Sequence, residues 1–345
     1  MVADRQPRLA LSFRPHAEAN LGRFTLIHVI GILELVVAIV LAIVFGWLCL
    51  RAWHRRNLAI RIVLGLIATV LTVVLALVSI VGVVGAYRLY APHGGPPANV
   101  TAQAPADVVA AAGRRANGCT GCHSSTGDLP LDGGSDNFLG GPLGTLYAPN
   151  LTQGGPLKDW TDGEIVRAIR EGVDRDGHPL IIMPSDAFHF LSDADVQALV
   201  AFLRSQPAST HTTPARDLGI MALVLIGGGL FPTAEQPLIT QSQSAPPPGV
   251  SAAYGKYLVD ITGCRLCHGQ TLEGGAPGGF GPPPGPGLRA LVPTWQEAAF
   301  ISFFRTGVDP YDRAIDPNEM PWKDIGKAYS DDELRAMYAY IKSPN

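Results

Sequence analysis

The sequence is poor in charged residues and in cysteine, and each shortage excludes a class of protein. Charged residues make up 16% of the 345 positions, against 47% hydrophobic residues, a composition that leans toward membrane proteins. Basic side chains are scarcest after residue 91, where 17 Lys and Arg face 26 Asp and Glu, whereas residues 1–91 carry 9 against 3. No nucleic-acid partner is predicted for such a chain. The acidic C-terminal region instead suits a basic protein partner that docks in a salt-sensitive way.

Four of the only five cysteines fall in two copies of one pentapeptide, Cys119–His123 (CTGCH) and Cys264–His268 (CRLCH). A C-x-x-C-H run is the attachment signature of c-type haem. Two thiols one helical turn apart can form thioethers with the two vinyl groups of one porphyrin, and the adjacent imidazole can then reach the iron. A C-x-x-C pair also serves zinc and thioredoxin-like sites, but no further cysteine pair and no βαβ pattern accompanies either copy. The sequence therefore predicts two covalently bound haem c groups, attached through Cys119, Cys122, Cys264 and Cys267 and ligated by His123 and His268.

The methionines indicate what each haem does, because the sixth iron ligand decides its chemistry. Met1 is the initiator, Met221 lies in an apolar linker segment and Met337 lies inside the last predicted helix. Met183 and Met320 remain, and each is followed by proline. Ligation by His and Met raises the reduction potential and closes the iron to substrates. The two residues are therefore predicted as axial ligands, and their alternative role is as core residues of a loop.

An internal duplication supports two haem domains. Residues 160–174 match residues 295–309, both Met-Pro pairs align, and SDADVQALVAFLRS at 192–205 matches SDDELRAMYAYIKS at 330–343. The pattern predicts one domain at 105–208 and a second at 250–345, joined by a linker at 209–249. His189 is an alternative ligand to Met183, but it has no counterpart in the second repeat.

Within the first repeat, helices are predicted over 107–116, 160–171 and 192–204. Ser192 and Asp195 form a capping-box pattern at the start of the last helix. Arg170 and Arg305 occupy matching places in the two repeats, where a guanidinium could pair with haem propionates. The alternative for both is a solvated charge at a helix end.

Two apolar stretches near the N-terminus, 24–50 and 62–87, are each long enough to span a bilayer as a helix. The arginine-rich loop between them, 51–56, should be cytoplasmic by the positive-inside rule. Haem c is attached outside the cytoplasm, so the residues after 90 should be exoplasmic. Both arguments predict a multi-pass anchor over 24–88 in the cell membrane with an exoplasmic tail at 1–23, although the four arginines of that tail point weakly the other way.

Several residues and segments around the anchor leave alternatives open. Glu34 lies inside a predicted span, where a carboxylate is costly and often functional; it could line a quinone or proton path, contact a partner subunit, or be a hydrogen-bonded interfacial residue. His28 lacks the second facing histidine that a membrane haem b would need, and Cys49 is interpreted as structural. Residues 89–104 are predicted as an extended tether. The short apolar segment 218–231 is predicted to pack between the haem domains or to dip into the membrane interface.

Residues from about 105 to 345 resemble the class I cytochrome c family, and specifically membrane-anchored dihaem cytochromes c similar to the cytochrome subunits that serve bacterial periplasmic dehydrogenases. The resemblance rests on both C-x-x-C-H motifs, on 148–152 (APNLT), on 160–173 (WTDGEIVRAIREGV) and on the two Met-Pro sequences. It implies an all-α fold, with three or more helices around one haem per domain. It also implies His and Met as axial ligands, at His123, Met183, His268 and Met320. The family's glycine nine residues before the first cysteine appears as Gly255, whereas the first domain has Ala110 there, which puts the packing of that domain's first helix on its last in doubt.

The predicted function is one-electron transfer from a membrane or periplasmic donor to a soluble cytochrome or an oxidase, with no catalytic residue. One alternative is a dihaem redox enzyme, peroxidase-like or thiosulfate-oxidising, which needs an iron with an open or displaceable ligand site. A second alternative is an integral subunit of a larger respiratory complex, such as a dehydrogenase or an oxidase. A free-standing carrier and a complex subunit need the same haem domains. The expected partners are redox donor and acceptor proteins and membrane lipid.

Overall fold

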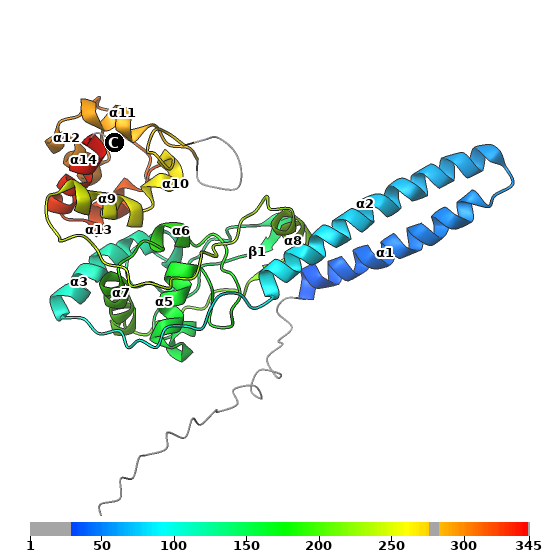
Figure 1. Cartoon of the computed structure of the whole chain (residues 1–345), viewed down its shortest axis with the longest axis horizontal. Coiled ribbons are helices and arrows are strands. Elements are labelled where there is room, and N and C mark those ends of the chain that lie inside the picture. Colours follow the sequence, from blue (N-terminus) through cyan, green and yellow to red (C-terminus); the bar gives the residue numbers. More distant parts are fainter. Residues whose placement is uncertain (1–28, 276–282, 344–345) are drawn as a thin grey trace, which may run out of the picture.

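The computed structural model describes residues 29–275 and 283–343, and the regular secondary structure of this part is almost entirely helical. A long helical hairpin projects from a helical body (Figure 1). The hairpin comprises α1 (Val29–Trp53) and α2 (Leu58–Tyr90), both long and apolar enough to cross a membrane. The two predicted spans are therefore present as helices, with α2 three residues longer at its C-terminal end than predicted. The tail 1–23, the predicted start of the anchor at 24 and His28 lie outside the described residues.

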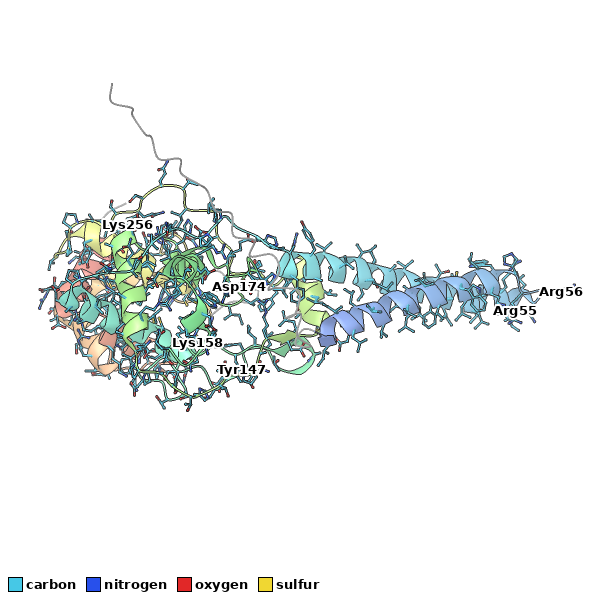
Figure 2. The ribbon with its side chains drawn as sticks, turned by 90° about the horizontal axis from the view of Figure 1, so that it is seen from below. Arg55, Arg56, Tyr147, Lys158, Asp174 and Lys256 are labelled. Carbon is cyan, nitrogen blue, oxygen red and sulfur yellow. The ribbon has the colours of Figure 1, made fainter. Side chains whose placement is uncertain are left out.

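The hairpin places the start of α1 and the end of α2 at the same end, next to the body. The tight connection between α1 and α2 lies at the far tip, where Arg55 and Arg56 point away from the body (Figure 2). Asn57 caps α2 there, because its side-chain oxygen accepts hydrogen bonds from the backbone N–H groups of Ala59 and Ile60. The start of α1 and the end of α2 both lie next to the body (Figure 1).

The first repeat folds as a compact helical unit. Its helical elements are α3 (Ala106–Arg115), η2 (Ala116–Cys119), α4 (Thr120–His123), η3 (Gly141–Leu143), η4 (Pro156–Asp159), α5 (Asp162–Glu171), α6 (Ser185–Phe188) and α7 (Asp193–Ser205). The predicted helices are confirmed to within two residues. Helix α5 starts at Asp162 because Thr161 is its N-cap and forms a full capping box with Glu164.

The second repeat follows the same order. It contains α9 (Ala252–Ile261), α10 (Cys264–His268), α11 (Leu288–Leu291), η5 (Val292–Thr294), α12 (Glu297–Thr306), α13 (Trp322–Ala328) and α14 (Asp331–Lys342). Helices α5 and α12 both end at a left-handed glycine, Gly172 and Gly307. Each glycine leads into an equivalent loop closed by one bridge, Val173 with Pro179 and Val308 with Ala314. The duplication seen in the sequence is thus a duplication of structure.

The apolar segment 218–231 does not pack between the repeats, so the first of its two predicted placements is wrong. The second placement, at the membrane interface, stays a prediction. A short antiparallel pair of strands, β1 (Gly144–Thr145) and β2 (Asp217–Leu218), leads into α8 (Ile220–Gly227). Helix α8 packs against α2 and α1 at the base of the hairpin, where its Ala222 and Leu223 are fully buried.

The segment after α2 is extended, as predicted, but it is docked rather than free. The N–H of His93 donates to the carbonyl of Gly177, and the Ala102 N–H donates to Asp162 Oδ2 at 2.8 Å. Arg167 Nη1 also donates to the carbonyl of Gly95 at 2.8 Å. The segment therefore lies along the first repeat and links it firmly to the hairpin.

One hydrophobic core runs through both repeats. It joins Ile165, Val196 and Val200 of the first repeat to Leu258 and Phe300 of the second. The buried apolar surface is therefore continuous across the boundary between the repeats.

Candidate haem sites

Both C-x-x-C-H motifs lie on short helical turns. The first occupies η2 and α4, and the second forms α10. The helical backbone places the two cysteines of each pair on neighbouring turns of one face, the spacing that attachment to one porphyrin needs. Within the described residues the four thiols form no disulfide.

Each motif histidine is buried and held by a backbone carbonyl. His123 Nδ1 donates to the Pro149 carbonyl at 2.9 Å, and His268 Nδ1 donates to the Pro286 carbonyl at 2.7 Å. Such a bond leaves Nε2 unprotonated and aimed away from the carbonyl, which is how a metal-binding imidazole is usually oriented. His268 Nε2 is buried without a hydrogen-bond partner in the described part of the chain.

The protonation states fit haem attachment. Burial lowers the pKa of His123 and of His268, against the opposing effect of the carbonyl bonds, so both imidazoles are neutral at pH 7 and able to bind iron. Burial raises the pKa of the Cys119 and Cys264 thiols to about 12. A zinc site or a redox-active thiol is built to favour the thiolate. These cysteines instead suit the neutral thioether links of haem c.

The loops around the two motifs leave little room for side chains other than glycine. A Cβ at Gly134 would lie 2.3 Å from the carbonyl oxygen of Cys122, and one at Gly275 would lie 2.1 Å from that of Cys267. A Cβ at Gly285 would meet the His268 ring at 2.6 Å. The backbone thus wraps each motif closely, in the same way in both repeats.

The loops that carry Met183 and Met320 are also built alike. Asp174 Oδ1 accepts from the N–H groups of Asp176 and His178, and Asp309 Oδ1 accepts from the N–H groups two and four residues after it. Both methionines are half-buried just before a short helix, α6 or α13. Their ligation of iron stays a prediction.

Arg170 and Arg305 form equivalent ion pairs at the start of the last helix of each repeat. Arg170 Nη1 lies 2.7 Å from Asp193 Oδ1, and Arg305 Nη2 lies 2.7 Å from Asp331 Oδ1. Every nitrogen of the Arg305 guanidinium donates a hydrogen bond. Arg170 is buried and its Nε and Nη2 find no partner within the described residues. Propionate contact stays a prediction for both, and Arg170 has the greater capacity for it.

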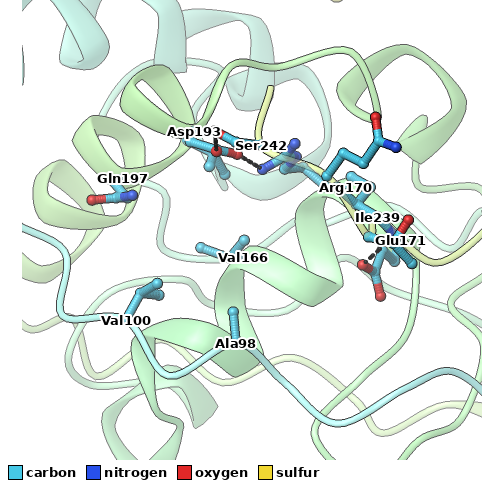
Figure 3. A pocket seen from close by; sticks show the side chains of 12 residues that line it. Ala98, Val100, Val166, Arg170, Glu171, Asp193, Gln197, Ile239 and Ser242 are labelled. Carbon is cyan, nitrogen blue, oxygen red and sulfur yellow. Dashed lines mark hydrogen bonds and ion pairs between the residues drawn. The ribbon is translucent and has the colours of Figure 1, made fainter. Parts of the chain in front are cut away.

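Arg170 and Asp193 line a cavity of about 330 Å³ between α5, α7 and the linker residues Ile239–Ser242 (Figure 3). His189, the alternative ligand to Met183, donates a hydrogen bond from Nδ1 to the Arg170 carbonyl at 3.0 Å. This ring nitrogen is therefore engaged by the end of α5.

The structure brings the two motifs together at an interface that the sequence did not predict. Helix α6, which follows Met183, packs on α9 of the second repeat. Helix α13, which follows Met320, packs on α3 and η2 of the first repeat. A cavity of about 200 Å³ lies between them, lined by Cys119 and Pro184 from one repeat and by Leu266 and Pro321 from the other. Each methionine loop thus covers the approach to the opposite C-x-x-C-H motif.

Arg115 holds this interface. Its Nη1 lies 2.7 Å from Asp195 Oδ1 in its own repeat, and its Nη2 lies 3.0 Å from Glu333 Oε1 and 2.9 Å from the Tyr254 hydroxyl in the other. Burial alone would lower the pKa of Arg115, but the facing tyrosines and carboxylates raise it above its ordinary value, so the residue stays charged. Tyr257 of the second repeat adds another hydrogen bond across the interface, from its hydroxyl to Asp195 of the first repeat.

The same interface changes the cap of α7. The Ser192 side chain accepts from the Asp195 N–H as predicted, but the Ser192 N–H donates to the Tyr257 hydroxyl instead of to Asp195. The capping box is complete at the matching place in the second repeat, Ser330 with Glu333. Asp195 is therefore redirected from capping to the interface.

Comparison with known proteins agrees with this site. The family model for cytochrome c matches residues 92–207 and 252–344. The chain is 32% identical to a nicotinate dehydrogenase component of Pseudomonas putida over 58% of this chain and 18% of that protein. It is 27% identical to the cytochrome c subunit of the quinone-dependent alcohol dehydrogenase of Gluconobacter oxydans, over 66% of this chain and 52% of that protein. It is 29% identical to the cytochrome c subunit of gluconate 2-dehydrogenase from Pantoea cypripedii, over 45% and 36%. The chain thus spans about half or less of the length of these relatives.

Proposed function

Because the chain belongs to the cytochrome c family, we propose that it is a membrane-tethered dihaem cytochrome c that transfers single electrons between a dehydrogenase and a further acceptor. The observation that carries the proposal is the complete repetition of the site. Each repeat has a C-x-x-C-H motif on a helical turn, a buried imidazole with Nδ1 bonded to a carbonyl, and a Met-Pro loop of the same construction.

The residues of the chain have definite roles in this proposal. The haem, when bound, supplies the one-electron chemistry. Cys119 and Cys122 hold it in the domain 105–208, and Cys264 and Cys267 hold it in the domain 250–345. His123 and His268 would bind the two irons, and their carbonyl partners fix the ring orientation. Met183 and Met320 would supply the second protein ligand to each iron and so exclude substrates from it.

The interface between the repeats provides the internal route for the electron. Cys119 of one motif and Leu266 of the other line the same cavity of about 200 Å³ between the repeats. Arg115 and its partners hold that arrangement, so the distance across the junction stays constant.

The names of the similar proteins support a proposal for the partner and for the location of this chain. Three of the similar proteins are named as cytochrome subunits of alcohol, gluconate or fructose dehydrogenases. We therefore propose a dehydrogenase as the electron donor and a haem-bearing body on the periplasmic side of the cell membrane, with the hairpin α1–α2 as a two-pass anchor. The acidic balance of the residues after 91 favours docking of a basic surface.

The test is a potentiometric titration of the purified full-length protein by visible spectroscopy, with carbon monoxide added to the reduced form. Two positive potentials and no carbon monoxide shift are expected, because both irons have His and Met ligands. The Met183→Ala and Met320→Ala variants should each bind one equivalent of carbon monoxide, while Met221→Leu, on the exposed face of α8, should bind none. Carbon monoxide binding by the unmodified protein would favour a redox enzyme instead.

A further inference from the structure

Helix α8 is attached to the hairpin by direct contact of backbones. A Cβ at Gly85 would lie 1.8 Å from the Leu223 carbonyl oxygen, and a Cβ at Gly227 would lie 2.0 Å from that of Val81. Only glycine permits this approach, so α2 and α8 are in contact along two turns. The chain uses two glycines to bring an apolar helix of eight residues against the base of the hairpin.

The hairpin also provides a charged group of the correct sign at each end of α8. Glu34 Oε2 of α1 accepts a hydrogen bond from the Ile220 N–H, the first of the helix, at 2.7 Å. Arg88 Nη1 of α2 donates to the Ile226 carbonyl at 3.0 Å and to the Gly227 carbonyl at 3.3 Å, at the last turn. An acid at the N-terminus and a base at the C-terminus satisfy unpaired backbone groups and complement the helix dipole. Glu34 thus has a specific partner within this chain.

The position of α8 along the hairpin coincides with the edge of a bilayer. The hydrocarbon core takes about 20 residues of a helix. Counted from Arg51 back along α1, that length ends near Gly31; counted from Arg61 forward along α2, it ends near Val81. A Cβ at Gly31 would lie 2.0 Å from the Leu218 carbonyl oxygen, and Val81 contacts Gly227. One count therefore ends at β2, two residues before α8, and the other ends at the last residue of α8.

The outer face of α8 is apolar and uncovered. Met221 is 48% exposed and Leu230, just after the helix, is 63% exposed. The helix has no charged residue. Val84 and Tyr87 on the adjoining helix α2 are exposed as well. An aromatic residue such as Tyr87 is typical of the boundary between lipid and water.

We propose that α8 and the turn that follows it form a third membrane-contacting element, which inserts Met221 and Leu230 among phospholipid chains at the interface and holds the haem-bearing body at a set height above the bilayer. This inference rests on the proposed membrane anchor. Clamped by Glu34 and Arg88, α8 prevents the body from swinging about the end of α2, in agreement with the docked segment that follows Tyr90. The occupant of the exposed face is lipid.

The experiment uses single-cysteine variants of the full haem-loaded chain in phosphatidylcholine nanodiscs, in a Cys49→Ser background. The rate of reaction with a water-soluble maleimide is measured for Met221→Cys, for Val73→Cys in the middle of α2 and for Lys158→Cys on the body. Val73 and Met221 are matched, because 51% and 48% of each residue is exposed when lipid is left out. We expect the first two variants to react at least about tenfold more slowly than Lys158→Cys, because a thiol in lipid is neither ionised nor reached by the reagent.

The three rates separate the possible failures. Slow reaction at position 73 with fast reaction at position 221 would overturn the inference and leave the anchor intact. Fast reaction at both would overturn the anchor itself. Glu34→Ala added to Met221→Cys should raise the rate at position 221 by about tenfold, because a lost bond to a charged group is worth at least that factor. Glu34→Gln, which keeps an acceptor oxygen, should raise it less than about threefold, and neither change should alter the rate at position 158.

Discussion

Arg115 offers the sharpest test of how the two repeats are joined. Its guanidinium is 19% exposed and bridges Asp195 and Glu333, which are 23% and 16% exposed. Both carboxylates occupy the third position of the last helix in their own repeat. Replacing Arg115 by Met keeps an apolar stem of similar length but leaves two acids facing each other without a cation.

The size of the effect follows from the burial of these groups. Removing one partner of a fully buried ion pair costs about 3–5 kcal/mol. Because about a fifth of each side chain still reaches water, we expect a loss of about 2–3 kcal/mol in the free energy of unfolding for Arg115→Met. The loss should fall on the contact between the repeats, so that the single unfolding transition separates into two.

The assay is urea unfolding of the haem-loaded protein in detergent, followed by far-UV circular dichroism and by haem absorbance. Arg114→Met is the matched control, because Arg114 is the exposed neighbour on the same helix. That variant should stay within about 0.5 kcal/mol of the unmodified protein. Adding Glu333→Gln to Arg115→Met should recover part of the loss, since one of the two unpaired charges is then removed. Equal stability of the two Met variants would refute the assigned role of Arg115.

Two further predictions concern packing and pH. Gly255→Ala should destabilise the protein by about 3 kcal/mol in the same assay, because the added Cβ would lie 1.8 Å from the Ala336 carbonyl oxygen. The control is Gly118→Ala, whose added Cβ meets nothing within 4 Å and which should change stability by less than about 1 kcal/mol. The Asp174 carboxylate, 3.6 Å from His178, raises the pKa of that imidazole above 6.5, so its stabilising contribution is complete below pH 6.5 and is lost as pH rises through the raised pKa. His178→Gln should therefore show a smaller loss of stability between pH 6 and pH 8 in urea titrations, and an unchanged pH profile would contradict this assignment.

The structure also corrects one comparison drawn from the family. Gly255 lies against the backbone of α14 as the family pattern implies. In the first repeat Ala110 stands at the matching position, yet α3 still packs on α7. The close contact has moved to Gly113, where a Cβ would lie 2.7 Å from the ring of Phe202. A glycine one turn further along the helix thus serves the same crossing, which spacing counted from the cysteines does not reveal.

The sequence by itself determined the local chemistry and the repeated elements. The two C-x-x-C-H motifs, the Met-Pro loops and the periodic helices are short patterns whose meaning depends on neighbours within one or two turns. The predicted helices accordingly agree with the structure to within two residues, and both long apolar stretches are helical wherever the structure describes them. The capping prediction at Ser192 was correct only in part, because Tyr257, 65 residues away, took the place of one of its partners.

The tertiary structure alone decided which of these parts touch. Arg115 and Glu333 are 218 residues apart, and Glu34 and Ile220 are 186 residues apart. A hydrogen bond between such distant groups leaves no period and no spacing in the chain. Arg115 and Glu333 look like ordinary surface charges in the sequence, and nothing near Glu34 indicates that its partner is the N–H of Ile220. Of the two placements predicted for the segment 218–231, packing between the repeats was wrong for the same reason, since an apolar segment is equally stable against any apolar surface of the right shape. The glycines at the base of the hairpin, Gly85 and Gly227, and the charged side chains of Glu34 and Arg88 make the hairpin the surface on which α8 packs.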